Sequence, residues 1–280
     1  MTRNTRLKIN IVLIILILAL ALLAVAGICL NIAGYRYYKA DNGSKFIGKT
    51  TDGIILRGTI ILADGSRATI DRTLGTIEYD NGDKYDGEFS GFYRSGKGIM
   101  TYASTGDVYE GTFAADKISG TGVYRCADGS YYEGEFVDGK KSGQGKYTWS
   151  DGSYYEGGFL DNRKSGSGKY VGADGSSYVG EYLNDRKNGT GTFVYANGDK
   201  YTGEFVDDRR EGTGTYIWAN GESYTGEFKN NMKHGKGIYK WPEPNVRSYE
   251  GYFENGAVVI EDEEDADAAE DSEPDTGGEE

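Results

Sequence analysis

Carboxylates are the residues of this chain whose type and spacing could do chemistry. Glutamates recur in two rows, which are Glu110, Glu133, Glu156 and Glu250, and Glu88, Glu135, Glu181, Glu204 and Glu227. Two carboxylates held close together can hydrolyse a glycosidic bond. A catalytic pair is unique in its chain, however, whereas these glutamates return in unit after unit. We therefore expect no catalytic residue among them.

Other reactive groups are few. His234 is the single histidine, so a Ser-His-Asp triad, a zinc hydrolase site or a proton relay would have to use it, and no partners gather around it in the sequence. Cys29 lies in an apolar segment and Cys126 in the polar part, so we expect no disulfide and no Cys-based metal site. The spacing of a calcium loop is not present. The sequence predicts a protein that is not an enzyme and holds no metal and no cofactor.

Basic residues recur with one period. One row, spaced 23 residues apart, consists of Lys141, Lys164, Lys187, Arg210 and Lys233. Because these residues fall in the same turn of successive units, we expect them to line one edge of the array. Such an edge could bind anionic lipid headgroups or an acidic partner. The alternative is an ordinary solvated turn, since acids such as Asp138 and Asp161 lie beside the bases.

Aromatic residues form two more rows. They are Tyr132, Tyr155, Tyr178, Tyr201 and Tyr224, and Phe136, Phe159, Tyr182, Phe205 and Phe228. We expect both rows to form the hydrophobic core. The alternative is a surface that stacks on sugars or on an aromatic-bearing peptide. For that surface, the candidate exposed platforms are Trp149, Trp218 and Trp241.

Composition narrows the classes of protein. The 280 residues include 44 glycines, 24 tyrosines and only 3 prolines. So many aromatic residues argue against a disordered linker, and collagen needs abundant proline and a three-residue glycine period. The formal net charge of −13 disfavours nucleic acid as a partner. Residues 261–280 hold 12 acidic residues and no basic ones, and we expect them to form a disordered tail.

A repeated unit positions these residues. It begins at Tyr85, Tyr109, Tyr132, Tyr155, Tyr178, Tyr201, Tyr224 and Tyr249. Within one unit, Tyr132, Gly134 and Phe136 alternate with polar residues, as in a β-strand. A second strand contains a Gly-x-Gly pair, such as Gly143 and Gly145, and Asp-Gly or Asn-Gly turns separate the strands. Each unit is predicted to be a β-hairpin, and stacked hairpins supply the core that a single hairpin lacks.

This unit resembles the MORN repeat (membrane occupation and recognition nexus), which reads roughly Y-x-G-x-F-x-x-G-x-x-x-G-x-G. The resemblance covers residues 85–253. Upstream, Phe46-Ile47-Gly48 and two Asx-Gly turns indicate degenerate units that lack the Gly-x-Gly pair. The unit at Tyr249 is truncated and is expected to act as a cap. Because MORN proteins are discussed as phosphoinositide or membrane binders, the resemblance implies lipid binding as one option.

Residues 11–30 form an apolar run whose one polar side chain is that of Cys29. As a helix this run would span about 30 Å, the thickness of a hydrocarbon core. We expect an uncleaved anchor, and the alternative is a cleaved signal peptide with Ala24-Val25-Ala26 as its cleavage site. Basic residues flank the run on both sides, so charge does not fix its orientation. The short stub before it favours an extracytoplasmic repeat region.

Together these patterns predict an all-β fold, an elongated single-layer antiparallel sheet of about 17 strands, preceded by one transmembrane α-helix. The expected parts are the anchor (1–33), degenerate hairpins (34–84), the repeat array (85–260) and the acidic tail (261–280). The predicted function is a single-pass, membrane-anchored, non-enzymatic scaffold or adaptor for a protein partner or anionic lipid headgroups. The alternative is a cell-envelope carbohydrate-binding module. The oligomeric state stays open, because an edge strand could pair with another copy.

Overall fold

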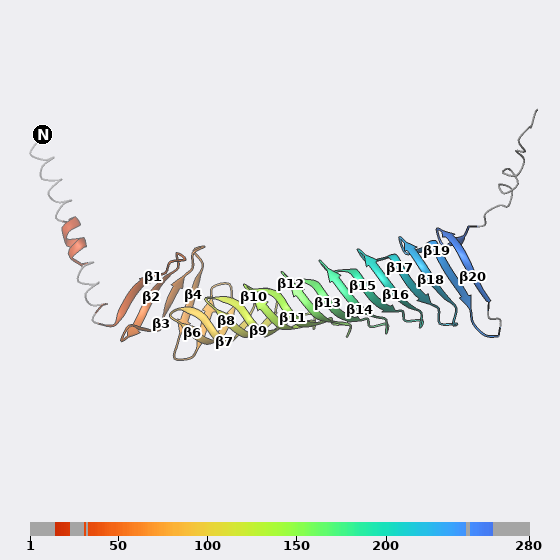
Figure 1. Ribbon diagram of the computed structural model, residues 1–280. Coiled ribbons are helices and arrows are strands. Elements are labelled where there is room, and N and C mark those ends of the chain that lie inside the picture. The colour runs from red at the N-terminus through yellow and green to blue at the C-terminus, as the bar shows by residue number, and fades with distance from the viewer. Residues whose placement is uncertain (1–14, 23–30, 32, 245–246, 260–280) are drawn as a thin grey trace, which may run out of the picture. The chain divides into compact units, whose positions relative to one another are not determined.

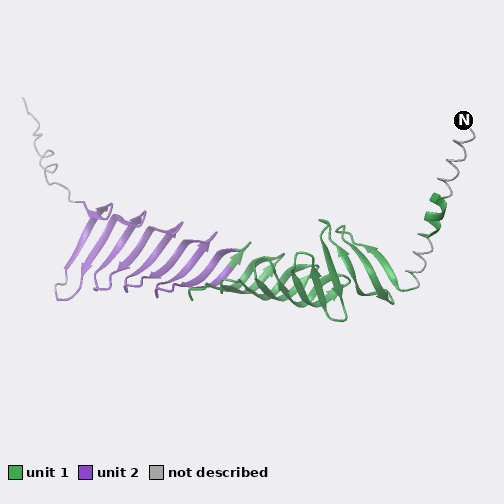
Figure 2. Ribbon diagram, turned by 180° about the vertical axis from the view of Figure 1, so that it is seen from behind, with its two compact units in different colours: residues 1–152, 159–162 green, residues 153–158, 163–280 purple. Residues whose placement is uncertain are grey.

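The computed structural model describes residues 15–22, 31, 33–244 and 247–259. In these residues, twenty-one strands form a single antiparallel open sheet (Figure 1). The chain divides into two compact units, which Figure 2 colours separately. Unit 1 comprises residues 1–152 and 159–162, and unit 2 comprises residues 153–158 and 163–280.

Within each unit, consecutive strands pair antiparallel. Unit 1 holds β1 (Tyr35–Lys39), β2 (Lys45–Thr51), β3 (Ile54–Ile61), β4 (Arg67–Asp71), β5 (Thr76–Tyr79), β6 (Lys84–Ser90), β7 (Tyr93–Thr101), β8 (Val108–Ala114), β9 (Lys117–Arg125), β10 (Tyr131–Val137) and β11 (Lys140–Thr148). Strand β12 (Tyr154–Leu160) has residues in both units. Unit 2 holds β13 (Arg163–Val171), β14 (Ser177–Leu183), β15 (Arg186–Val194), β16 (Lys200–Val206), β17 (Arg209–Ile217), β18 (Ser223–Lys229), β19 (Met232–Trp241), β20 (Arg247–Glu254) and β21 (Ala257–Val258).

The predicted all-β fold of stacked antiparallel hairpins is confirmed. The described residues contain 21 strands rather than the 17 or so expected, and five of them, β1 to β5, lie in residues 35–79 upstream of the regular units. Four of the five turns that follow these strands contain an Asn-Gly or Asp-Gly pair, and the turn between β4 and β5 has Leu74-Gly75 instead. Residues 35–79 therefore form hairpins like those of the regular units, although they lack the Gly-x-Gly pair.

The glycines of each unit make room for a tyrosine ring. In β10 and β11, Gly134 pairs with Gly145, and the ring of Tyr132 lies over both. A Cβ built at Gly145 would stand only 2.5 Å from Cε2 of that ring. Tyr132 is 1% exposed, and its hydroxyl donates to the carbonyl of Glu135 at 3.0 Å. A side chain at either glycine would therefore push the ring out of the core.

The first glycine of each Gly-x-Gly sequence is needed for its backbone conformation and not for ring packing. Gly143 has a φ of 71°, and the register of β10 and β11 shifts between Gly134 and Phe136. This is a β-bulge, where positive φ favours glycine. Oε1 of Glu135 accepts the backbone N–H of Gln144 at 2.9 Å beside the bulge. The Gly-x-Gly pattern therefore combines one residue for backbone conformation and one for ring packing.

Tyrosine and phenylalanine rings join neighbouring hairpins. The ring of Tyr132 meets Phe136 of its own strand and Phe159 of the next hairpin, with both centroids 5.0 Å away. Interplanar angles of 86° and 82° give edge-to-face contacts. In unit 2, Tyr201 makes the same two contacts with Phe205 and Phe228. The two aromatic rows are the core, as the period-two pattern predicts.

The upstream hairpin β2–β3 uses the same packing with a different ring. Phe46 is fully buried and lies against Gly48 and Gly58, which pair across the strands. A Cβ at Gly48 would stand 2.6 Å from Cζ of Phe46. The expected degenerate unit at Phe46-Ile47-Gly48 therefore keeps the ring-on-glycine core of the regular units.

The predicted membrane segment lies mostly outside the described residues. Of residues 11–30, the structure describes 15–22, which are helical and have exposed apolar side chains. No helix within the described part of the chain is long and apolar enough to cross a membrane. The acidic tail, residues 261–280, also lies outside the described residues, as does Cys29.

Candidate interaction surface

One face of the sheet carries both the aromatic core and a row of cations. The register of β10 and β11 places Tyr132 opposite Tyr147 and Phe136 opposite Lys141. Residues directly opposite each other in an antiparallel pair point to the same side. We call this side, with the equivalent positions of the other hairpins, the aromatic face.

The basic row predicted to line a turn edge lies over the rings of the aromatic face. In unit 1, Nζ of Lys141 is 5.5 Å from the ring centroid of Tyr132 and 4.3 Å from that of Tyr147. The unit 2 cations are similarly placed, with Lys164 5.0 Å from Tyr182, Lys187 5.5 Å from Phe193, Arg210 5.0 Å from Tyr216 and Lys233 4.8 Å from Tyr239. All five cations are half-buried. These distances are those of cation–π contacts.

Burial changes the electrostatics of these cations. Loss of water lowers the pKa of Lys164, although Asp185 and Asp208 act in the opposite direction. Burial likewise lowers the pKa of Lys233, and Glu222 opposes that shift. Lys187 differs in having a direct partner, since its Nζ lies 3.1 Å from Oδ1 of Asp208. The aromatic face thus holds positive charge that is partly stripped of water.

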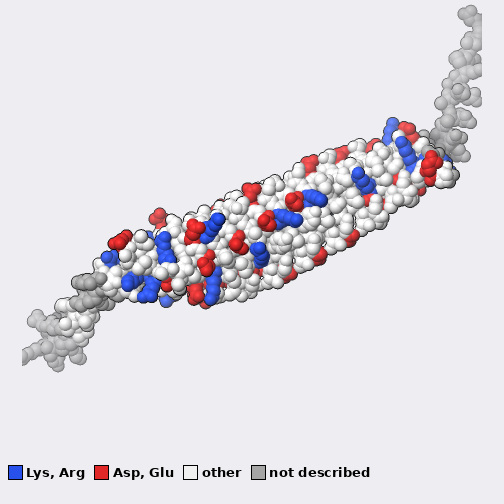
Figure 3. Space-filling view, turned by 90° about the horizontal axis from the view of Figure 1, so that it is seen from below, with Lys and Arg blue, Asp and Glu red and all other residues white. Residues whose placement is uncertain are grey.

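The exposed turn edge carries a different set of cations, namely the basic residue directly before each half-buried one. Lys140, one residue before Lys141, points to solvent and pairs with Asp161 of the next turn at 2.9 Å. Arg186, one residue before Lys187, pairs with Asp207 at 3.4 Å. Exposed pairs of this kind add little stability. The turn edge therefore carries alternating charges, and Figure 3 shows blue and red groups interspersed on the face in view.

Acidic and amide side chains in the turns join successive hairpins. Asp208 has a φ of 69°, and its Oδ1 accepts the backbone N–H of Lys187 at 2.9 Å. The backbone N–H of Asp208 in turn donates to the carbonyl of Lys187 at 3.0 Å. Asn231 makes the same pair of bonds with Arg210. These bonds hold the backbone of Lys187 and Arg210 in place.

The glutamates at the fourth position of the repeated unit, counted from its first tyrosine, are structural, and they are Glu88, Glu135, Glu181, Glu204 and Glu227. Oε1 of Glu204 accepts both the backbone N–H and the hydroxyl of Thr213, each at 2.8 Å. The backbone donor and then the hydroxyl lower the pKa of Glu204. Glu227 accepts the backbone N–H of Lys236 at 3.1 Å in the same way. Each carboxylate supports a bulge, which explains their recurrence.

A third row of carboxylates was not predicted from the sequence. Asp199 is 8% exposed, and its carboxylate accepts the hydroxyl of Tyr216 at 2.6 Å and the backbone N–H of Ala219 at 2.9 Å. The Tyr216 hydroxyl, followed by the Ala219 amide, lowers the pKa of Asp199. Asp107 makes the equivalent bonds to Tyr124 and Ala127 in unit 1. The signal in the sequence is the acid that directly follows a Gly turn, as in Asn197-Gly198-Asp199.

The family model of the MORN repeat matches seven consecutive segments of the chain. They are residues 85–106, 109–131, 132–154, 155–177, 178–200, 201–223 and 224–243, which make up more than half of the sequence. The chain belongs to the MORN-repeat family. The upstream strands β1 to β5 and the last two strands, β20 and β21, lie outside the matched segments, so the expected unit at Tyr249 is not matched.

Two solved structures with similarity to this MORN protein are TCP domains. The TCP domain of SAS-4 from Drosophila melanogaster, in complex with a proline-rich motif of Ana2, is 19% identical, with a TM-score of 0.31 and coverage of 61% of this chain and 90% of that chain. A mutant TCP10 domain of CPAP from Danio rerio is 13% identical, with a TM-score of 0.33 and coverage of 76% and 92%. We draw no conclusion from similarities this low. No curated protein matches the chain.

The tryptophans predicted as exposed platforms lie half-buried on the MORN hairpins. The ring of Trp149 contacts that of Tyr147, with centroids 4.9 Å apart and an interplanar angle of 56°. Trp218 lies between Tyr216 and Tyr239, at 4.6 Å and 5.3 Å. Trp241 follows at 4.7 Å from Tyr239. The structure thus brings Trp218 and Trp241 together with the unit 2 cations on the aromatic face.

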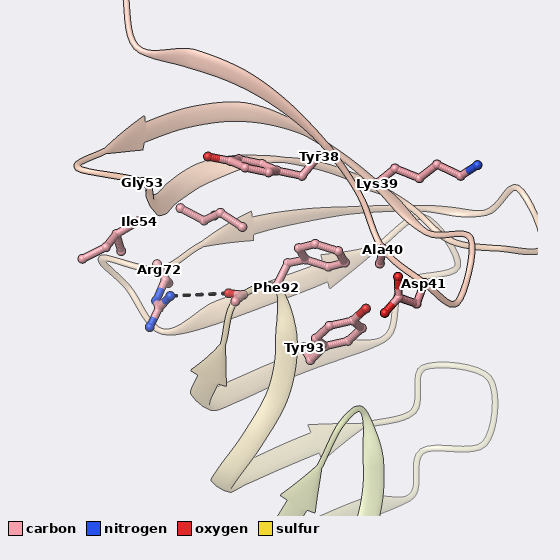
Figure 4. Close-up of a pocket in the computed structure, with 11 residues that line it drawn as sticks. Tyr38, Lys39, Ala40, Asp41, Gly53, Ile54, Arg72, Phe92 and Tyr93 are labelled. Carbon is pink, nitrogen blue, oxygen red and sulfur yellow. Dashed lines mark hydrogen bonds between the residues drawn. The ribbon is translucent and has the colours of Figure 1, made fainter.

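A cavity of about 520 Å³ lies between the turns of the upstream hairpins and the β6–β7 turn of the first matched MORN segment (Figure 4). Its walls include the rings of Tyr38, Phe92 and Tyr93. The guanidinium of Arg72 donates to the carbonyls of Phe89 and Gly91 at 3.3 Å and 3.4 Å. No three His, Cys, Asp or Glu side chains within the described residues are grouped so as to hold a metal ion.

Proposed function

We propose that this MORN protein is a membrane-anchored, non-enzymatic scaffold that holds an acidic segment of a protein partner on its aromatic face. The observation that carries the proposal is the row of half-buried cations over aromatic rings, repeated from hairpin to hairpin. A carboxylate of the partner would meet a partly desolvated cation, and its apolar side chains would meet the tryptophan and tyrosine rings.

Lys164 and Lys233 are the cations that gain most from an acidic partner. Burial lowers the pKa of both side chains, because their ammonium groups have lost part of their hydration in the unbound protein. An incoming carboxylate offsets that loss, and exclusion of water strengthens the attraction. The exposed turn cations gain less, because Lys140 and Arg186 already pair with aspartates in high dielectric. An acidic partner is therefore expected to select the aromatic face over the turn edge.

The membrane anchor is supported by the apolar run at residues 11–30. A helix of twenty residues would be long enough to cross the hydrocarbon core. In the described part, Leu16, Leu18 and Leu20 are 55%, 58% and 59% exposed, so these side chains are not buried against the sheet. An extracytoplasmic repeat region belongs to the same proposal.

Neighbouring cations in unit 2 provide a matched experiment. One variant replaces the half-buried cations (Lys164→Gln, Lys187→Gln and Arg210→Gln), and the control replaces their exposed neighbours (Arg163→Gln, Arg186→Gln and Arg209→Gln). Both lose three charges from the same hairpins. The probe is a synthetic peptide of alternating Glu and Tyr, and the readout is fluorescence anisotropy with the full chain in detergent. Circular dichroism verifies that both variants are folded.

The first variant should weaken peptide binding by at least about tenfold, and the control by less than about threefold. Equal losses would place binding on the turn edge and contradict the proposal. Binding of phosphoinositide vesicles instead of the peptide would support the lipid-headgroup alternative. Retention on insoluble cell wall that soluble saccharide releases would support the carbohydrate-binding alternative, with the tryptophans as platforms.

A further inference from the structure

The first three strands have an exposed face that is unlike the repeats. Tyr35 and Tyr37 of β1 point to the same side as Ile47 of β2, because Tyr37 lies opposite Ile47 in the register. These side chains are 42%, 57% and 49% exposed. The other side of the same hairpin carries Phe46, which is fully buried. An aromatic and apolar surface therefore faces outward here.

Four cations surround these side chains. Lys39 lies opposite Lys45, and Lys49 lies opposite Arg57. Three of the four are exposed and Lys49 is half-buried. Within the described residues none of the four forms an ion pair, although Asp71 lies opposite Arg57 in the register of β3 and β4. We call the three outward side chains and these four cations the outer patch.

The cations of the outer patch differ from the paired cations of the turn edge. Exposed turn cations farther along, such as Lys117 and Lys140, pair with aspartates of the next turn. The cations of the outer patch have no such partner, so they repel one another and favour a negatively charged surface nearby. Tyrosine and isoleucine between them would enter an apolar layer rather than water.

We propose that the outer patch lies on the headgroup layer of an anionic phospholipid membrane. The inference rests on the proposed membrane anchor, because Tyr35 follows the apolar run 11–30 after only four residues. Tyrosine favours the membrane–water interface, and Lys and Arg near an anionic leaflet add attraction. The patch orients the sheet against the bilayer, whereas the anchor alone would leave either face of β1 toward it.

Two tryptophan reporters on opposite faces of β1 test this orientation. Tyr37→Trp reports on the outer patch and Tyr38→Trp on the other face of the same strand. The full chain is reconstituted in vesicles of phosphatidylglycerol and phosphatidylcholine whose acyl chains are brominated near the headgroups. Emission above that of the wild-type protein, which has its own tryptophans, measures each reporter. A second outer reporter, Tyr35→Trp, covers the case in which Tyr37→Trp misfolds.

The outer reporters should be quenched at least about twofold more than Tyr38→Trp. In the Tyr37→Trp protein, adding Lys39→Gln, Lys45→Gln and Arg57→Gln should remove that difference. Equal quenching on both faces, or quenching unaffected by the three glutamines, would overturn the inference. Flotation separates the two proposals. A chain that floats with the vesicles but keeps its outer reporters unquenched contradicts the outer patch alone, whereas a chain that does not float contradicts the anchor and the patch with it.

Discussion

The ring of Tyr132 occupies the space that a side chain at Gly145 would fill. A Cβ at that glycine would stand 2.5 Å from both Cε2 and Cζ of the ring. Gly134 and Gly145 lie opposite each other across β10 and β11, so the ring packs on the backbone of two residues that have no side chain. This contact recurs in successive MORN hairpins and makes a single layer of sheet able to bury its own core.

Gly145→Ala should destabilise the protein by about 1–3 kcal/mol, because the ring must leave its place to admit a methyl group. The measurement is the thermal midpoint by far-ultraviolet circular dichroism. Gln144→Ala, at the exposed neighbouring position, is the control and should change the midpoint little. A Gly145→Ala protein as stable as that control would show that the ring is not confined by the glycine.

Asp199→Asn should destabilise unit 2 by about 1–3 kcal/mol at neutral pH, since the carboxylate accepts from Tyr216 and from Ala219. The sign of the pH dependence follows from the lowered pKa of Asp199. A carboxyl with a lower pKa in the folded state stabilises above its unfolded pKa, and this stabilisation is lost as the pH falls through the folded pKa. The wild-type and Asp199→Asn midpoints should therefore converge in acid. A difference that stays constant down to about pH 2 would contradict this role.

The buried tyrosines should make the protein unfold in alkali. Burial raises the pKa of Tyr85, Tyr109, Tyr132, Tyr155, Tyr178, Tyr201 and Tyr224 to about 12. A group with a raised folded pKa stabilises fully below its unfolded pKa of about 10, and this stabilisation is lost as the pH rises through 12. Tyrosinate absorbance should rise in two steps, with the second coinciding with loss of the β-sheet signal. A single titration near pH 10 with the sheet intact would contradict burial of these rings.

Glu204→Ala should cost about 0.5–1.5 kcal/mol, because it removes the acceptor of the backbone N–H and the hydroxyl of Thr213 at the bulge. Chemical denaturation of the variant measures the effect. Glu133→Ala, at an exposed position of the other glutamate row, is the control and should be close to neutral. Equal effects of the two changes would contradict a specific role for the fourth-position carboxylates.

The hairpins and their core could be predicted from the sequence. The face of the sheet on which the side chains of the basic row lie could not. Alternation around Tyr132 fixes which residues are buried, and Asx-Gly pairs fix the turns. From the sequence, Lys141 is predicted to lie in the turn beside Lys140. The bulge at Gly143 shifts the register, so that Lys141 comes opposite Phe136 and turns onto the aromatic face. A shift of one residue reverses the face of a side chain, and residue type alone does not report it.

The most direct test of the proposed function is which face of the sheet touches a partner in intact cells. A photoreactive phenylalanine analogue is placed at Phe193, on the aromatic face, or at the neighbouring Val179, which lies opposite Thr192 and is 55% exposed on the other face. Illumination followed by electrophoresis of the full chain reports covalent adducts. We predict an adduct from position 193 that disappears in the Lys164→Gln, Lys187→Gln, Arg210→Gln background, and none from position 179. Adducts from position 179 alone, or equally from both, would contradict binding on the aromatic face.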